Sequence, residues 1–233
     1  MKCLAIIPAR SGSKGLPDKN IKNLNGKPLM YYTIKAALDS KCFEEVMVST
    51  DSNRYAEIAK ECGAKVPFLR SEATAGDGAG TWDTVREVLN EYRKLGKEFD
   101  YVTVLQPTSP LRDDVDIVRA FEQLREGYVN NVVSIVSVEH PVQWCFRLPE
   151  NGMLDEFAQS PYNNVRRQDL EKHYRENGAI YIVDAKKIMD DNYNFYADKC
   201  FGYIMRPDKS VDIDTELDFM IAEKVYANIL KWD

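Results

Sequence analysis

The chain has 233 residues, of which 44% are hydrophobic, and it carries a net charge of −6 at pH 7. This length and composition suit one α/β domain with a full core, and an acidic chain argues against nucleic acid as its main partner. The five scattered cysteines form no Cys-x-x-Cys pair, which indicates reduced thiols in the cytoplasm and argues against disulfides or zinc. Because no long apolar stretch is present, we expect neither a signal peptide nor a membrane helix.

The first strand is predicted at residues 3–7, where an apolar run is stopped by Pro8. The loop that follows holds three cations, Arg10, Lys14 and Lys19, among serines and glycines. Glycine lets the backbone approach an anion closely while Arg and Lys neutralise it, so this loop suits a nucleotide phosphate. It has neither the Walker spacing nor that of a dinucleotide-binding loop. The alternative is a basic surface loop that only turns the chain.

Strands and helices are predicted to alternate along most of the chain. The later strands are expected at residues 44–51, 65–70, 101–105, 131–138, 177–184 and 199–206, and the helices at 28–40, 53–62, 84–96, 115–126 and a last stretch to about 230. This alternation is typical of βαβ units, in which helices flank both faces of a mostly parallel sheet. Asp51 and Ser52 are placed to cap the helix that follows them, and Pro67 marks its strand as a sheet edge.

Polar residues follow the central strand at the end where such sheets bind ligands. We therefore expect Gln106, Ser109 and Arg112 to face the same crevice as Arg10. The loop at residues 71–83 is rich in Gly and Ala. It either turns the chain or lets a base or ribose lie against the backbone.

The alternation stops between residues 139 and 175. This segment carries Trp144, Phe146 and Phe157 but shows no helical or strand period. A long irregular segment in a compact domain is usually functional or an interface, and aromatic residues without a core of their own favour an interface. We predict that residues 1–233 form one domain and that this segment is its dimerisation arm.

Two carboxylates near the last helix form a candidate metal site. Asp212 and Asp214 are two residues apart, so on an extended segment both carboxylates face one side. Mg²⁺ prefers one or two carboxylates together with substrate phosphates. The alternative is helix capping, because Thr215 and Asp218 form a capping box; the two roles can coexist.

Arginines gather where the irregular segment ends. The guanidinium groups of Arg166, Arg167 and Arg175 match carboxylates and phosphates, which favours an anionic ligand unless neighbouring glutamates pair with them. Protein nucleophiles have little support, since both histidines lie in the arm and no G-x-S-x-G elbow exists. A transfer that uses a substrate hydroxyl, a metal and cations on the leaving group fits better.

Four motifs together resemble one enzyme family over essentially the whole chain. They are I-I-P-A-R-S-G-S-K-G-L-P-D-K-N (6–20), L-Q-P-T-S-P-L-R (105–112), R-R-Q-D-L-x-x-x-Y-R-x-N-G-A-I-Y-I (166–182) and D-I-D-T-E-L-D (212–218). The chain resembles the CMP-sialic acid synthetases, or N-acylneuraminate cytidylyltransferases. The resemblance implies that CTP and N-acetylneuraminate give CMP-N-acetylneuraminate and pyrophosphate with Mg²⁺, for which Mn²⁺ can substitute. It also implies a Rossmann-like nucleotidyltransferase fold and a cytoplasmic homodimer paired through the arm.

The resemblance assigns roles to individual residues. It places Arg10, Lys19 and Asn20 at the CTP phosphates and Arg70, Ala79 and Thr81 around the cytidine. It places Gln106, Arg167 and Arg175 on the sugar acid, in a pocket shaped by Tyr181 and Phe195. It assigns metal binding to Asp212 and Asp214, which would act with Arg10 and Lys19 in catalysis.

The acid itself stays open at this point. Some members of the family carry Lys where Gln143 stands here, so legionaminate, pseudaminate and 3-deoxy-manno-octulosonate are alternatives. The motif at 166–182 favours the sialic type over the octulosonate type. A nucleotide-binding regulatory or scaffold protein is the alternative of another class. Lys19, Asp212 and Asp214 argue against it, because a binder needs no two-carboxylate metal site.

Overall fold

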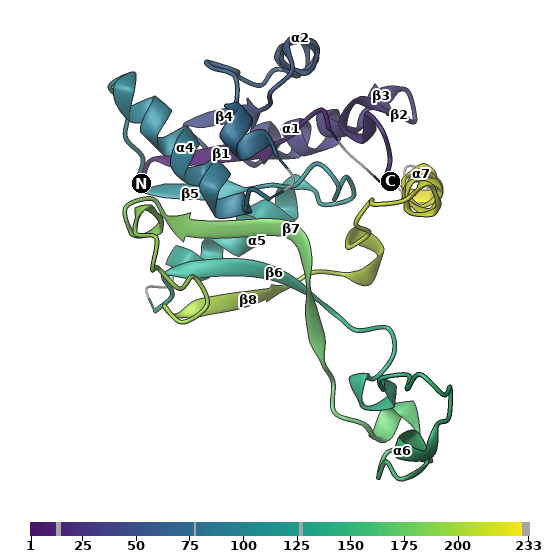
Figure 1. Cartoon of the computed structure of the whole chain (residues 1–233). Helices are drawn as coiled ribbons and strands as arrows, with labels where there is room; N and C mark the ends of the chain where they lie inside the picture. The colour runs from purple at the N-terminus through teal and green to yellow at the C-terminus, as the bar shows by residue number, and fades with distance from the viewer. Residues whose placement is uncertain (13–14, 77, 126–127, 230–233) are drawn as a thin grey trace.

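A six-stranded sheet forms the centre of the computed structural model, which describes residues 1–12, 15–76, 78–125 and 128–229 (Figure 1). Its strands, in spatial order, are β4 (Glu45–Ser49), β1 (Cys3–Pro8), β5 (Tyr101–Val104), β7 (Tyr174–Asp184), β6 (Asn131–Ser137) and β8 (Cys200–Ile204). β1 runs parallel to β4 and β5, and β6 runs parallel to β8, whereas β7 is antiparallel to both of its neighbours. The predicted mostly parallel sheet is confirmed. The predicted phosphate-loop cation Lys14 lies outside the described residues.

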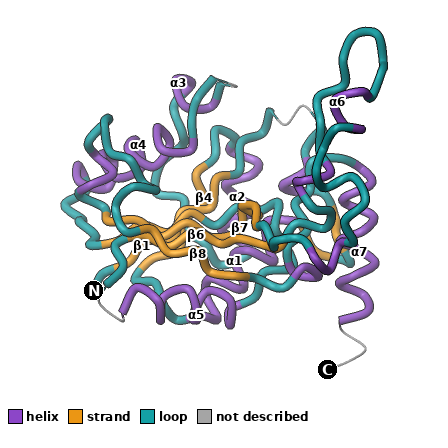
Figure 2. The backbone as a smooth tube through the Cα atoms, turned by 90° about the horizontal axis from the view of Figure 1, so that it is seen from below, coloured by secondary structure: helices purple, strands orange, loops and turns teal. Residues whose placement is uncertain are grey.

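Helices cover both faces of this sheet. The α-helices of the described residues are α1 (Leu29–Ser40), α2 (Asn53–Glu61), α3 (Glu72–Ala75), α4 (Thr81–Lys94), α5 (Asp114–Arg125), α6 (Asp155–Ala158) and α7 (Glu216–Ile229), of which α6 lies away from the sheet. Figure 2 shows α4 on one side of the strands and α1 and α5 on the other. Because strand side chains alternate between faces, Ala5 and Ile7 pack into the core under α1 and α5, whereas Leu4 and Ile6 pack into the core under α4.

The strand expected at residues 65–70 does not form. Lys65 makes a single parallel bridge to Met47, and the chain then leaves the sheet. Pro67 has no N–H to extend the ladder, so β4 is the edge strand and this prediction is wrong. The short pieces Asn23–Leu24 and Lys27–Pro28 pair with each other as β2 and β3, apart from the main sheet.

The predicted arm projects from the body at the lower right of Figure 1, with α6 near its far end. It leaves the body after β6 and returns through β7, which begins at Tyr174, three residues earlier than expected. Inside the arm Phe146 packs on Phe157, with ring centroids 4.7 Å apart. Large apolar side chains nevertheless stay exposed there, namely Val142, Phe146, Leu148, Met153, Leu154 and Tyr162. Pairing of two subunits through the arm stays a prediction.

None of the helices in the described part of the chain combines the length and the apolar character that crossing a membrane requires.

Candidate functional site

A cavity of about 390 Å³ opens beyond the carboxyl ends of β1 and β5. It is lined by eight of the residues that the sequence singled out, namely Arg10, Lys19, Asn20, Arg70, Ala79, Thr81, Gln106 and Asp214. They come from segments up to 204 residues apart in the chain, for example Arg10 and Asp214. The fold therefore places all six residues expected at CTP around a single cavity.

The loop after β1 is held by polar contacts although it has little regular structure. Ser11 donates to the Asp51 carboxylate through its backbone N–H and its hydroxyl, each at 2.8 Å. Asp51 is partly buried, which opposes ionisation, but these hydrogen bonds prevail and lower the pKa of its carboxyl. Asp51 thus anchors the loop rather than capping α2, whose N-cap is Ser52. The buried Asn20 donates to the carbonyl of Arg10 at 3.1 Å, and Arg10 Nη1 reaches the carbonyl of Ala75 at 3.2 Å.

A second guanidinium faces the same cavity. Arg70 donates from Nε to the Ser49 hydroxyl and from Nη2 to the Ser49 carbonyl, each at 3.0 Å. Burial lowers the pKa of Arg70, and the like charge of Arg10 acts in the same direction. Two guanidinium groups held beside one cavity favour a ligand with several negative charges.

The carboxylate segment meets the loop after β1 directly. Lys19 Nζ lies 2.8 Å from Asp214 Oδ1 and 2.8 Å from the carbonyl oxygen of Ile213. Gly15 packs so tightly that an added Cβ would stand 2.6 Å from the carbonyl oxygen of Asp214. Ile213 is buried, and its N–H donates to the Thr108 carbonyl at 2.9 Å. The loop after β1, the turn after β5 and the carboxylate segment therefore form one unit.

Asp212 carries the feature that best fits a cation. Its Oδ1 is buried and has no hydrogen-bond partner among the described residues, and burial raises the pKa of the carboxyl. An unpartnered buried carboxylate oxygen is costly, and a bound cation would satisfy it. No cluster of three His, Cys, Asp or Glu exists among the described residues. Asp212 and Asp214 are the carboxylates that could hold a metal ion here, with substrate phosphates and water as its other ligands.

A neighbouring hollow of about 400 Å³ joins Arg175 to both carboxylates. Gly178 explains how the end of β5 comes close to them. It has φ +74°, which favours glycine, and an added Cβ would lie 3.4 Å from Gln106 Oε1 and 3.7 Å from Asp212 Oδ2. Gln106 and Asp212 thus meet beside a residue without a side chain.

Two residues expected in the crevice lie in the interior instead. Arg112 is only 1% exposed, and its Nη2 donates to Thr33 Oγ1 at 2.8 Å. Burial lowers the pKa of Arg112 to about 10. Ser109 is fully buried, and its hydroxyl donates to the carbonyl of Asn177 at 3.5 Å. The prediction was wrong for both, because their side chains bond to partners in α1 and β7 and neither lines the cavity.

The remaining predicted residues are not gathered in the main cavity. Arg167 lines a separate cavity of about 730 Å³ between the arm and the segment after β8. Tyr181 and Phe195 join Trp82 in a cluster of rings, with centroids 6.1 Å and 5.1 Å from that of Trp82. Trp82 follows Thr81, which lines the main cavity, but none of these three rings is among the lining residues of that cavity.

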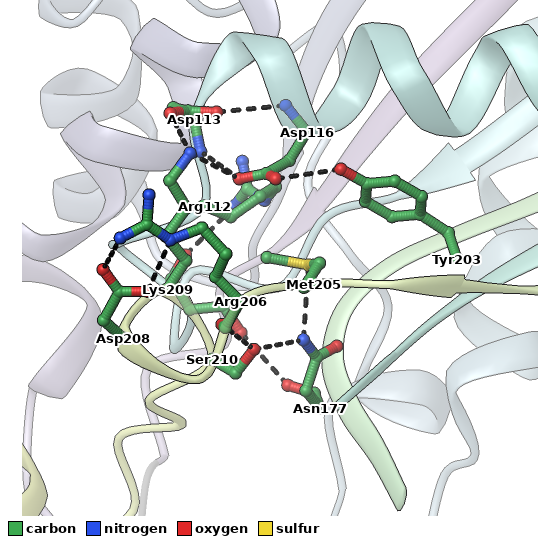
Figure 3. A network of polar contacts seen from close by, with 11 residues as sticks. Arg112, Asp113, Asp116, Asn177, Tyr203, Met205, Arg206, Asp208, Lys209 and Ser210 are labelled. Atoms are coloured by element: carbon green, nitrogen blue, oxygen red, sulfur yellow. Dashed lines mark hydrogen bonds and ion pairs between the residues drawn. The ribbon is translucent and has the colours of Figure 1, made fainter. Parts of the chain in front are cut away.

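A polar network that the sequence did not reveal supports the carboxylate segment (Figure 3). Lys209 bonds to Asp113 and lies 3.2 Å from Asp116. The buried Asn177 donates to Ser210 Oγ at 2.9 Å, two residues before Asp212. No local pattern marks these partners, because Lys209 stands 96 and 93 residues from the two aspartates in the chain.

Known proteins resemble the chain along most of its length. A family model described as cytidylyltransferase matches residues 4–225. A CMP-N,N'-diacetyllegionaminic acid synthase of Legionella pneumophila is 40% identical over 232 residues, covering 97% of this chain and 96% of the relative. An N-acylneuraminate cytidylyltransferase of Streptococcus agalactiae is 39% identical over 94% of this chain, and the chain spans about half the length of that relative, 52%. A solved structure of CMP:2-keto-3-deoxy-manno-octonic acid synthetase complexed with CTP has a TM-score of 0.69 over 98% of this chain and 100% of that one. Because the two sequences are only 18% identical, this structural likeness is evidence for the fold alone.

Proposed function

The chain belongs to the cytidylyltransferase family, and on that premise we propose that it transfers CMP from CTP to the anomeric hydroxyl of a nonulosonic acid, releasing pyrophosphate. One observation carries the proposal. A single cavity gathers two guanidinium groups, an ammonium group and the Asp214 carboxylate where nucleotides bind such sheets. The acid would enter beside Asp212, where Gln106 and Arg175 lie close by.

The chain's own groups account for most of the chemistry. Arg10 and Lys19 would neutralise the charge that grows on the leaving pyrophosphate, while Arg70 holds the nucleotide in place. When bound, Mg²⁺ would add positive charge at the phosphate and lower the pKa of the attacking hydroxyl. Asp212 and Asp214 would hold it, with Mn²⁺ as a substitute, and the charge of Lys19 lies within 2.8 Å of Asp214 Oδ1.

Replacing Gly15 by valine is expected to lower kcat/KM for CTP about 10²-fold. The new Cβ would press on the backbone of Asp214, which cannot yield as a flexible side chain would, so the loop and the carboxylate would separate. Gly12→Val in the same loop is the matched control, because a Cβ there meets nothing within 4 Å. Pyrophosphate release at varied CTP measures both; equal losses would contradict the close-approach role of Gly15.

Replacing Arg175 by alanine is expected to raise the KM for the acid about tenfold or more, with little change in the KM for CTP. Arg175 lies in the hollow beside Asp212, away from the cavity that holds Arg10 and Arg70. Steady-state kinetics with each substrate varied in turn checks this. A rise of the same size in both KM values would contradict the assignment of Arg175 to the acid site.

The sequence motifs favour N-acetylneuraminate as the acid. A second candidate is N,N'-diacetyllegionaminate, because the Legionella relative named for that product matches nearly the full length of both chains. Pseudaminate is a third acid of the same class.

We propose that the enzyme works as a homodimer in the cytoplasm. The exposed apolar side chains of the arm support the dimer, since isolated aromatic and aliphatic groups gain by being covered. Light scattering coupled to gel filtration at micromolar concentration tests it, and a monomer would contradict it.

Pyrophosphate release from CTP and Mg²⁺ with a panel of acids tests the function. The panel holds N-acetylneuraminate, N,N'-diacetyllegionaminate, pseudaminate and 3-deoxy-manno-octulosonate. Release with any of the first three supports the proposal. Release with the octulosonate alone would overturn the nonulosonic assignment, and no release with any acid would favour a nucleotide-binding protein without turnover.

A further inference from the structure

Glu176 is an exposed carboxylate that collects two tyrosine hydroxyls. Tyr181 donates to its Oε2 at 3.0 Å, and Tyr196 donates to its Oε1 at 2.8 Å. A carboxylate offers about four acceptor positions, and these two bonds use about half of them. The orientation of Glu176 is therefore fixed while part of its accepting capacity remains for a ligand.

The same tyrosines belong to a wall of rings, and Tyr181 lies on β7, the strand that also carries Arg175 and Gly178 of the proposed acid site. The Phe195 ring centroid lies 5.1 Å from that of Trp82 and 5.0 Å from that of Tyr196, and Tyr196 is 53% exposed. Burial raises the pKa of Tyr181, and the charges of Glu176 and Asp212 add to this. Tyr181 thus bonds to Glu176 on the strand whose Gly178 lies beside Asp212.

The charge of Glu176 limits what it can recognise. It would repel the carboxylate of the acid, which Arg175 attracts from its own hollow. A carboxylate that is oriented by two hydroxyls accepts from a neutral donor such as an N–H or O–H group. The rings beside it add apolar area, which favours a donor that carries a methyl group over a bare hydroxyl.

An acylamino group combines both features, because its N–H donates and its acyl methyl is apolar. By their names, N-acetylneuraminate carries one such group and N,N'-diacetyllegionaminate carries two. Resting on the proposed function, we propose that Glu176 and Tyr196 determine specificity for a nonulosonic acid with a second acylamino group. The second N–H donates to Glu176, and the acyl methyl packs on the rings of Trp82, Phe195 and Tyr196.

The test compares kcat/KM for the two acids in the wild-type chain and in E176Q and Y196F. The wild type should prefer N,N'-diacetyllegionaminate, the second candidate acid, to the N-acetylneuraminate that the sequence motifs favour. E176Q should lose about tenfold or more with that acid, and Y196F should lose less, while each changes kcat/KM for N-acetylneuraminate less than about threefold. Y193F is the matched control, because Tyr193 packs near the same rings but donates to another carboxylate, Asp198 at 2.8 Å, and not to Glu176.

The outcomes separate this inference from the function on which it rests. A preference that falls in E176Q and Y196F but not in Y193F supports the inference. Wild-type preference for N-acetylneuraminate, or equal losses with both acids, overturns the inference and leaves the cytidylyltransferase function standing. Absence of pyrophosphate release with every acid overturns the proposed function and the inference with it.

Discussion

Asp214→Ala is expected to reduce pyrophosphate release at least about 10³-fold while leaving the fold intact. The side chain of Asp214 is 73% exposed, so its loss removes little buried surface. Its backbone carbonyl would still pack on Gly15. What disappears is one of two carboxylates proposed to hold the cation, together with the partner of Lys19.

The measurement is the initial rate at saturating CTP, acid and Mg²⁺, with circular dichroism and thermal unfolding as checks on the fold. Asp208→Ala is the matched control, since Asp208 is another aspartate of the same segment and pairs with Arg206 outside the site. If Asp214→Ala kept near wild-type activity at saturating Mg²⁺, Asp214 would not be a metal ligand. An equal fall in Asp208→Ala would indicate a disturbed segment instead.

Lys209→Met is expected to lower the free energy of unfolding by about 3 kcal/mol. The Lys209 ammonium lies between Asp113 and Asp116, and the Asp116 side chain is almost completely buried. Burial and the neighbouring Asp113 raise the pKa of Asp116. Without the ammonium, two close carboxylates would face each other with no cation between them.

Urea unfolding followed by fluorescence measures this loss. Arg206→Met is the control on the same turn, and no measurable change is expected because the Arg206–Asp208 pair is exposed. Adding Asp116→Asn to Lys209→Met should restore part of the stability, since the buried one of the two carboxylate charges is then removed. A Lys209→Met variant as stable as the wild type would show that the network in Figure 3 adds nothing to the fold.

Local patterns in the sequence were sufficient to predict most helices and strands of the fold. The apolar run at residues 3–7 became β1, and Ser52 caps α2 as expected, accepting a hydrogen bond from the N–H of Tyr55. Such features depend on neighbours within a few residues, where side-chain period and hydrogen-bonding reach are set by the backbone itself. The phosphate loop and the carboxylate pair could be found for the same reason, since each is a compact motif.

Local patterns did not predict which distant segments pair as strands in the sheet, or in which direction. The segment at 65–70 has strand-forming residues, yet it stays outside the sheet except for one bridge. β7 entered the sheet antiparallel between β5 and β6. Strand direction depends on how the connections run, and here β7 returns from the arm, which is an irregular segment without a period of its own.

The directions of polar side chains were set by partners far away in the sequence. Arg112 turned inward to Thr33, 79 residues away, although its motif predicted a place in the crevice. Lys19 met Asp214 across 195 residues, and Lys209 met Asp113 across 96. A buried charge must find its compensating groups wherever the packed chain puts them. Residue type and spacing therefore selected the candidate residues of the site, and long-range packing established which of these groups lie within reach of one another.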